Sequence, residues 1–493
     1  MGIALIILYA AALLFILMYS LSQVDLAIRY WFKRKSVPTE VQPTPPSDWP
    51  MVTVQLPIYN ERYVIERLMD AVVGFDYPKD RLEIQVLDDS TDDTIEIVAQ
   101  KITDIKARTG IEIQHVRRGN RQGFKAGALA HGLKIAKGQF IAIFDADFVP
   151  ESDFLRLTIP YFGDEGLGVV QTRWEHLNAD YSLLTQLQAF ALDAHFTVEQ
   201  LGRNLSGCFI NFNGTAGVWR RKAIDDAGGW QSDTLTEDLD LSYRAQLKGW
   251  RFKYLEHVLS PAELPAEMAA IKSQQFRWTK GAAETARKNL WNVLRATMPF
   301  HVKLHATFHL LNSFLFVCIL SNALLSVPLV FMAAHDPVVA SFFQYGSVFF
   351  LSLFALILFF WISRESREEG KGVARLGRFL LRFPVFLAIS MGLSLHNAIA
   401  TLEGYLGMKS PFVRTPKYNI RTMKDNWRTR TAYLSRKVAP VTYLEGLLGA
   451  YFVGSIIGSI WIGNYGMLPY HILLACGFSA IFVLSIRHAS ARV

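Results

Sequence analysis

Two carboxylates that follow a buried strand are the first residues whose type and spacing indicate chemistry. Residues 138–144 read "GQFIAIF", an apolar and β-prone run that predicts a buried strand, and Asp145 and Asp147 come directly after it. Residues i and i+2 of an extended chain point to the same side, so the two carboxylates repel each other unless a cation lies between them. The pair therefore predicts a cation-binding position.

A second acidic pair stands at the end of another predicted strand. Residues 82–87, "LEIQVL", predict this strand, and Asp88 and Asp89 follow. Helix capping or turn formation explains a single aspartate well but explains two clusters at two strand ends poorly. Strands that alternate with helices over residues 51–144 predict a parallel sheet, and such sheets bind ligands beyond the carboxyl ends of their strands. Both pairs should therefore share one site.

A basic, glycine-containing stretch lies between the predicted strands at 111–116 and 140–144. Residues 117–129 read "RRGNRQGFKAGAL" and bring Lys125 with three arginines and three glycines, a composition that suits a phosphate. By itself it equally fits a solvated basic loop, and it is no P-loop motif. Together with the acidic pairs it favours a diphosphate and a hard cation, Mg²⁺ or Mn²⁺, that bridges carboxylate and phosphate oxygens.

Two later segments carry further candidate residues. "TEDLDLSYRAQLKGW" (236–250) predicts a helix with Thr236 as its N-cap; it is either simply well capped or presents an acid as general base. "QQFRWTKG" (274–281) holds an arginine and a tryptophan that either anchor an interfacial helix or grip a sugar.

Composition places these motifs in a membrane protein. Of the 493 residues, 51% are hydrophobic and only 19% are charged. The basic residues gather between the apolar runs, mainly over 363–440, which predicts a cytoplasmic catalytic domain, an outside N-terminus and no nucleic acid partner. Residues 383–402 are predicted to lie in the interface or to re-enter the membrane rather than to span it. The five predicted spans are 3–22, 306–334, 342–363, 441–463 and 465–486.

Other candidate ligands in the sequence are weaker. The three cysteines, Cys208, Cys318 and Cys476, are too far apart for a zinc or disulfide framework, which fits a reducing compartment. Asp193, His195 and Glu199 have a metal-like spacing, but an amphipathic helix at the membrane surface is the better interpretation. His305 and His309 are expected at the mouth of a span.

In order along the chain, the motifs are "QLPIYNE", "QVLDDSTDD", "GFKAGAL", "FDADFVP", "NGTAGVWRR", "TEDLDL" and "QQFRW". This series resembles inverting, metal-dependent family 2 glycosyltransferases of the cellulose synthase superfamily. It is most similar to the cellulose-synthase-like A and C groups, which make mannan, glucomannan and xyloglucan backbones. The resemblance covers residues 50 to about 285, together with "SPFVRTPKY" (410–418), which resembles a gating loop.

The resemblance implies an α/β GT-A (Rossmann-like) catalytic domain, joined to an α-helical transmembrane region of about five spans. Its donor would be UDP-glucose or GDP-mannose, and its acceptor a growing β-linked glycan. The implied nucleotide-binding residues are Tyr59, Glu61, Asp88, Asp89, Lys125, Asp145, Thr415 and Lys417. The implied metal ligands are Asp145 and Asp147. The implied catalytic and acceptor residues are Asp238 as general base, Glu237, Gln274, Arg277, Trp278, Asn213, Gly214 and Thr215.

One departure concerns Phe148, which stands where cellulose synthases often carry a histidine able to reach the metal. Two rival functions remain open: single addition of a sugar to a lipid, as in ceramide glucosyltransferase-like relatives, and a transporter or scaffold without chemistry. The membrane is expected to be the plasma or inner membrane or the Golgi, and no feature identifies an accessory subunit. The expected divisions are 1–24 (membrane helix), 25–49 (basic, proline-rich linker), 50–300 (catalytic domain ending in interfacial helices), 301–363 (helix pair), 364–440 (basic segment with the gating loop) and 441–493 (helix pair and tail).

Overall fold

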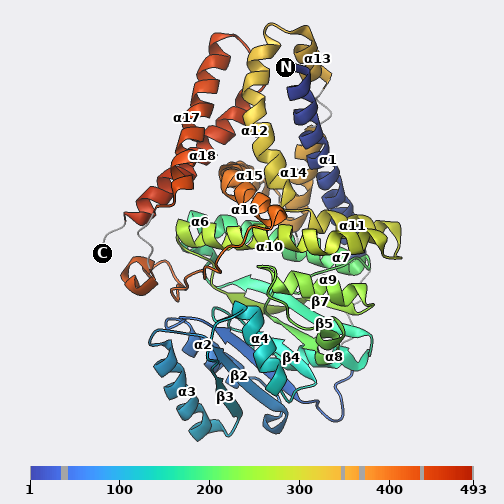
Figure 1. Cartoon of the computed structure of the whole chain (residues 1–493), viewed down its shortest axis with the longest axis vertical. Helices are drawn as coiled ribbons and strands as arrows, with labels where there is room; N and C mark the ends of the chain where they lie inside the picture. Colours follow the sequence, from blue (N-terminus) through green and yellow to red (C-terminus); the bar gives the residue numbers. More distant parts are fainter. Residues whose placement is uncertain (1, 35–42, 346–349, 366–371, 434–437, 491–493) are drawn as a thin grey trace.

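The computed structural model describes residues 2–34, 43–345, 350–365, 372–433 and 438–490. Parts of the predicted linker, of the predicted span 342–363, of the basic segment 364–440 and of the C-terminal tail lie outside these ranges. A sheet-containing domain forms one half of the molecule and long helices form the other, with α6, α10 and α11 lying between the two halves (Figure 1).

The sheet has seven strands in the order β3-β2-β1-β4-β6-β5-β7. The first four strands in the chain are parallel to one another, as the alternating pattern predicts. β6 instead runs antiparallel to β4 and β5, so the sheet is mixed. Because β6 runs away from the edge where β4 ends, residues 213–216 lie beside Asp145. The strands are β1 (Val52–Ile58), β2 (Leu82–Asp88), β3 (Glu112–Val116), β4 (Phe140–Ile143), β5 (Leu167–His176), β6 (Gly217–Arg220) and β7 (Arg251–Ala262).

Helices cover both faces of the sheet. Alternate residues of β1, such as Val54 and Leu56, pack with α2 and α3 in one hydrophobic cluster. The second cluster joins α4, α8 and α9 to residues such as Ile141 and Ile143 of β4. These helices are α2 (Ile65–Val73), α3 (Thr94–Thr109), α4 (Phe124–Ile135), α5 (Phe154–Thr158), α8 (Arg221–Asp226) and α9 (Glu237–Leu247).

Among the described residues, four helices are long and apolar enough to cross a membrane, or five if one bent pair counts as a single span. The bent pair, α15 and α16, turns by 48° next to Leu393, which fits a broken span or a re-entrant segment over the predicted 383–402. The predicted span at 342–363 corresponds to α13 and the shorter apolar α14. The helices of this half are α1 (Gly2–Lys33), α12 (Phe314–Ala333), α13 (Pro337–Tyr345), α14 (Phe350–Glu365), α15 (Val373–Gly392), α16 (Ser394–Leu406), α17 (Pro440–Trp461) and α18 (Leu468–Ala489).

The layer between the two halves is built from α6 (Leu183–Ala194), a π-helical turn (His195–Gln200), α7 (Leu201–Leu205), α10 (Met268–Arg295) and α11 (Phe300–Leu310). Two buried lysines fix α10 to the membrane half. The Lys272 ammonium lies 2.5 Å from Glu445 of α17, and the Lys280 ammonium lies 2.9 Å from Glu403 of α16. Removing one partner of such a buried pair leaves an uncompensated charge, so each pair specifies where α10 docks.

Candidate active site

The carboxyl ends of β1, β2 and β4 open on one cavity of about 190 Å³. The loop at 412–417, the helix α10 and the start of α9 form further parts of its wall. Fifteen of the residues singled out in the sequence line it: Tyr59, Glu61, Asp89, Lys125, Asp145, Asp147, Asn213, Gly214, Glu237, Asp238, Gln274, Arg277, Trp278, Thr415 and Lys417. Residues that lie up to hundreds of positions apart in sequence are thus brought together at the predicted sheet edge.

Asp88 and Thr215 do not line this cavity. The Asp88 carboxylate accepts the Ser90 amide at 2.8 Å and lies 2.7 Å from His115 Nε2, so it fixes the turn behind the strand end. The Thr215 hydroxyl accepts the Asp145 amide at 2.9 Å. Both residues therefore hold the cavity-lining residues in place.

Each carboxylate of the Asp145–Asp147 pair has a lysine as its partner. Lys125 Nζ lies 2.5 Å from Asp145 Oδ1 and donates to the Gly214 carbonyl at 3.0 Å. Lys417 Nζ lies 2.5 Å from Asp147 Oδ2 and donates to the Glu263 carbonyl at 2.7 Å. The sequence led us to expect positive charge at this position, and here two ammonium groups supply it.

The two carboxylates of this pair are suitable ligands for a small, hard cation that also binds to a substrate. Within the described parts of the chain, no group of three or more His, Cys, Asp or Glu side chains is arranged to hold a metal ion. Mg²⁺ and related ions, however, commonly bind through one or two carboxylates together with substrate phosphates. Asp145 and Asp147 supply two such carboxylates. Phe148, the departure noted in the sequence, is buried and packs edge-on against Trp174.

The second acidic pair, Glu237 and Asp238, begins α9 and differs in its electrostatics. Burial, reinforced by the neighbouring Asp238 charge, raises the pKa of Glu237 to about 7. Burial also raises the pKa of Asp238 to about 6, although Lys125 opposes the shift. An acid with such a pKa is a stronger base than an ordinary aspartate when it is ionised.

Glycine is required beside Asp238. Gly214 has a φ of +81°, and a side-chain Cβ at this position would lie 2.8 Å from Asp238 Oδ2. Lys125 also faces this point. Burial lowers the pKa of Lys125, but the negative charges of Asp145, Glu237 and Asp238 together raise it by more, so the pKa is raised overall. The loop before β6 therefore leaves room for the Asp238 carboxylate and keeps an ammonium group beside it.

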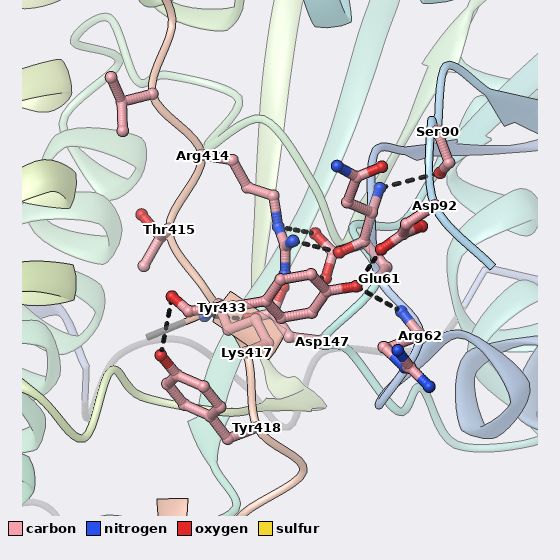
Figure 2. Close-up of polar contacts among 12 residues, drawn as sticks. Glu61, Arg62, Ser90, Asp92, Asp147, Arg414, Thr415, Lys417, Tyr418 and Tyr433 are labelled. Carbon is pink, nitrogen blue, oxygen red and sulfur yellow. Dashed lines mark hydrogen bonds and ion pairs between the residues drawn. The ribbon is translucent and has the colours of Figure 1, made fainter. Parts of the chain in front are cut away.

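The loop at 410–418 closes over the cavity and is held by ion pairs (Figure 2). The Arg414 guanidinium donates to both Glu61 carboxylate oxygens at 3.0 Å and also contacts the Asn60 carbonyl. Thr415 accepts a hydrogen bond from the Arg277 guanidinium at 2.8 Å, which links the loop to α10. Burial raises the pKa of Glu61 to about 7 in spite of Arg414.

A second contact holds the chain that follows the loop. The Tyr433 hydroxyl lies 2.6 Å from an Asp92 carboxylate oxygen, and its ring lies under the Arg414 guanidinium, 4.3 Å from ring centre to Cζ (Figure 2). The Tyr418 hydroxyl donates to Glu267 at 2.9 Å. The segment from 410 to 433 is thus fastened to the sheet domain at both ends.

Aromatic and cationic side chains cluster at the mouth of the cavity. The Arg121 guanidinium lies 3.4 Å from the centre of the Tyr59 ring, and Phe124 of α4 stacks on Phe412 of the loop at 5.5 Å. Flat faces of this kind suit a nucleobase. The sequence reasoning missed Phe412 and Arg414 as site residues, although both stand inside the gating-loop motif that it identified.

The weaker candidates form structural contacts. His195 Nδ1 lies 2.7 Å from Glu199 in the π-helical turn, and Asp193 pairs with Arg173 at 3.3 Å. His305 and His309 are buried, and they contact Asp25 and the Tyr243 hydroxyl respectively.

Comparison with known proteins identifies the domain that holds this cavity. Residues 50–281 match the model of the family described as glycosyltransferase like family 2. The chain carries a family 2 glycosyltransferase domain. Glucomannan 4-β-mannosyltransferase 1 of Oryza sativa subsp. japonica is 39% identical over 345 residues, which cover 65% of this chain and 64% of that protein. Glucomannan 4-β-mannosyltransferase 2 of Arabidopsis thaliana is 46% identical over 253 residues, which cover 50% of this chain and 47% of that one.

The chain therefore spans about half to two thirds of the length of these relatives. Among solved structures, a mannosyltransferase from Pyrobaculum calidifontis in complex with GDP-Man and Mn²⁺ matches with a TM-score of 0.53 and 19% identity. The match covers 81% of this chain and 99% of that one. This similarity establishes the GT-A fold that the sequence motifs predicted.

Proposed function

We propose that the protein is a membrane-embedded inverting glycosyltransferase that moves a mannosyl group from GDP-mannose to a growing β-1,4-linked glycan. The observation that carries the proposal is that Asp145, Asp147 and Asp238 line one cavity, with α10 as one of its walls. The names of the similar plant proteins support mannose as the sugar and β-1,4 as the linkage.

The residues of the cavity divide into two groups. Asp145 and Asp147 would hold a divalent cation together with the donor diphosphate, and the cation, when bound, neutralises charge on the departing nucleotide. Lys125, Arg277 and Lys417 line the same cavity and add positive charge beside that leaving group.

Asp238 takes the proton from the acceptor hydroxyl as that hydroxyl attacks the anomeric carbon. Attack opposite the leaving group inverts the configuration, so an α-linked donor yields a β-linked product. Trp278 lines the cavity from α10 and offers a flat ring against which the acceptor sugar stacks.

The membrane helices suggest where the product goes. α10 carries Gln274, Arg277 and Trp278, and Lys272 and Lys280 of the same helix pair with α17 and α16. We infer that the acceptor end of the cavity faces the membrane half and that the glycan leaves in that direction. The concentration of basic residues on the side of the sheet domain supports a cytoplasmic active site.

The proposal is tested with purified membranes, Mn²⁺ and labelled donors. GDP-mannose and UDP-glucose are supplied separately and together, and the labelled product is sized before and after treatment with β-mannanase or β-glucanase. A long product from GDP-mannose that β-mannanase degrades is expected. Label confined to a small, solvent-extractable lipid would instead establish single addition to a lipid acceptor.

A further inference from the structure

A second cavity lies away from the catalytic one, at the boundary between the sheet domain and the membrane helices. Its volume is about 580 Å³. Three structural parts enclose it: the first turns of α6, the loop at 423–428 and the facing sides of α15 and α18. None of its lining residues belongs to the catalytic cavity.

The level of this cavity matches that of lipid headgroups. α18 is one of the helices able to span a membrane, and its last turn carries Arg487 and His488. Basic residues at the end of a span mark the boundary between membrane and water. Leu484 and His488 of the same turns line the cavity, and the loop at 423–428 lies beside the ends of α17 and α18 (Figure 1).

The wall of the cavity changes in character from one side to the other. Leu187, Ile389 and Leu484 make it apolar where it meets the membrane helices, whereas Lys424 and Arg428 bring positive charge from the loop. An apolar wall beside two cations complements a phospholipid, with acyl chains against one part and a phosphate against the other.

Among the described residues that line the cavity, Asp425 is the one carboxylate, and it is engaged elsewhere. Asp425 Oδ2 accepts the amides of Arg421 and Thr422 at 2.9 and 2.8 Å, and these bonds hold the pKa of Asp425 below its ordinary value. Asp425 therefore shapes the turn, while Lys424 and Arg428 give the cavity its excess positive charge.

Local packing holds the Arg428 guanidinium in position. The Arg428 guanidinium lies 5.4 Å from the centre of the Trp427 ring, and Trp427 is itself buried against His488 at 5.3 Å. Trp427 also belongs to the hydrophobic cluster that contains Tyr418 of the loop at 410–418. Occupancy of the cavity would therefore stabilise the segment that continues from that loop.

We propose that this interfacial cavity binds an anionic membrane phospholipid, whose phosphate meets Lys424 and Arg428 and whose acyl chains lie against Leu187, Ile389 and Leu484. This site does not depend on the proposed mannosyl transfer. Its ligand is a component of the surrounding bilayer rather than a free phosphate, because the apolar wall gives a small anion no binding partner.

The test uses the full chain in phosphatidylcholine nanodiscs with and without phosphatidylglycerol, followed by native mass spectrometry of the lipid that stays bound. Wild-type protein should retain phosphatidylglycerol, and hydrogen exchange over residues 419–433 should slow when this lipid is present. The double variant Lys424→Gln, Arg428→Gln should lower retention on the order of tenfold, since two cations near the membrane surface are lost.

A matched control removes two basic residues that lie at the same membrane boundary but outside the cavity. Lys33 is the last residue of α1 and Arg34 follows it, and the double variant Lys33→Gln, Arg34→Gln should retain phosphatidylglycerol as wild type does. Equal loss in both double variants would show general surface attraction and overturn the proposal, as would equal retention of the two lipids by wild-type protein.

Two further variants and one competing ligand keep the test decisive. Leu183 also lines the cavity and is 57% exposed, so Leu183→Ser should weaken retention without unfolding the protein. Lys424→Gln alone covers the case in which the double variant fails to fold. Protection of residues 419–433 by water-soluble glycerol phosphate as strong as that by phosphatidylglycerol would identify a free-anion site and reject the lipid.

Discussion

The cavity contains two pairs of carboxylates whose electrostatic surroundings differ. Asp145 and Asp147 each have an ammonium group at 2.5 Å. Glu237 and Asp238 have burial as the dominant influence, and the pKa values of both are raised. The negative charges of the first pair are thus balanced by ammonium groups whose place a metal cation can take, whereas the raised pKa values of the second pair favour proton uptake. This difference supports the proposal that one pair binds the donor and the other transfers the proton.

The largest effect is expected from Asp238→Asn. An amide cannot accept the acceptor proton, so the initial rate of transfer should fall by about 10²–10⁴-fold, the usual contribution of a general base. Asp233→Asn, at an exposed position nearby that pairs with Lys288, is the matched control and should transfer normally. Unimpaired transfer by Asp238→Asn would remove Asp238 from the mechanism.

A smaller effect is expected from Asp147→Asn, which weakens the cation-holding pair. The loss of one charged ligand corresponds to roughly 1.5–3 kcal/mol, so the concentration of Mn²⁺ needed for half-maximal rate should rise about 10- to 100-fold. Asp153→Asn lies outside the cavity at an exposed position and serves as control. An unchanged Mn²⁺ requirement would mean that Asp147 does not hold the metal.

The pH dependence of transfer tests the second pair in the unmodified protein. A general base acts only in its ionised form, and the pKa of Asp238 is raised to about 6. Transfer at saturating donor should therefore rise with pH up to about 6 and fall about tenfold for each pH unit below that value. A rate that stays constant down to pH 4 would indicate an ordinary aspartate or a different base.

The smallest effect on transfer is expected from Asp88→Asn, because Asp88 lies behind the cavity wall. The substitution should weaken the bonds from this side chain to Ser90 and His115. The free energy of unfolding should therefore fall by about 1–3 kcal/mol, whereas the affinity for the donor should change little. Thermal unfolding and donor titration measure the two quantities separately. A loss of donor affinity without a loss of stability would place Asp88 in direct contact with the nucleotide.

The sequence predicted the parts of the site that depend on local pattern. Apolar runs located β2, β3 and β4, and the acids at the ends of β2 and β4 mark the sheet edge where ligands bind in parallel sheets. The ordered motifs then predicted Asp238 and α10. The antiparallel β6 was not predicted, because a four-residue strand carries too little periodicity to show its direction.

Contacts between distant segments could not be predicted from such patterns. Arg414 and Glu61 are 353 residues apart, and nothing in their local sequence indicates that they pair. The same holds for Lys417 with Asp147 and for Tyr433 with Asp92, which are 270 and 341 residues apart. These pairings follow from the path of the chain through the membrane helices, which returns the loop to the sheet edge.

The most direct test of the different roles proposed for the two carboxylate pairs measures binding of the donor apart from transfer of the sugar. Equilibrium binding of labelled GDP-mannose is measured with and without Mn²⁺ on purified wild type, Asp238→Asn and Asp147→Asn. The account predicts that Asp238→Asn binds the donor as wild type does, with the same gain from Mn²⁺, and that Asp147→Asn loses that gain. Loss of Mn²⁺-dependent binding in Asp238→Asn and its persistence in Asp147→Asn would contradict the assignment of the two pairs.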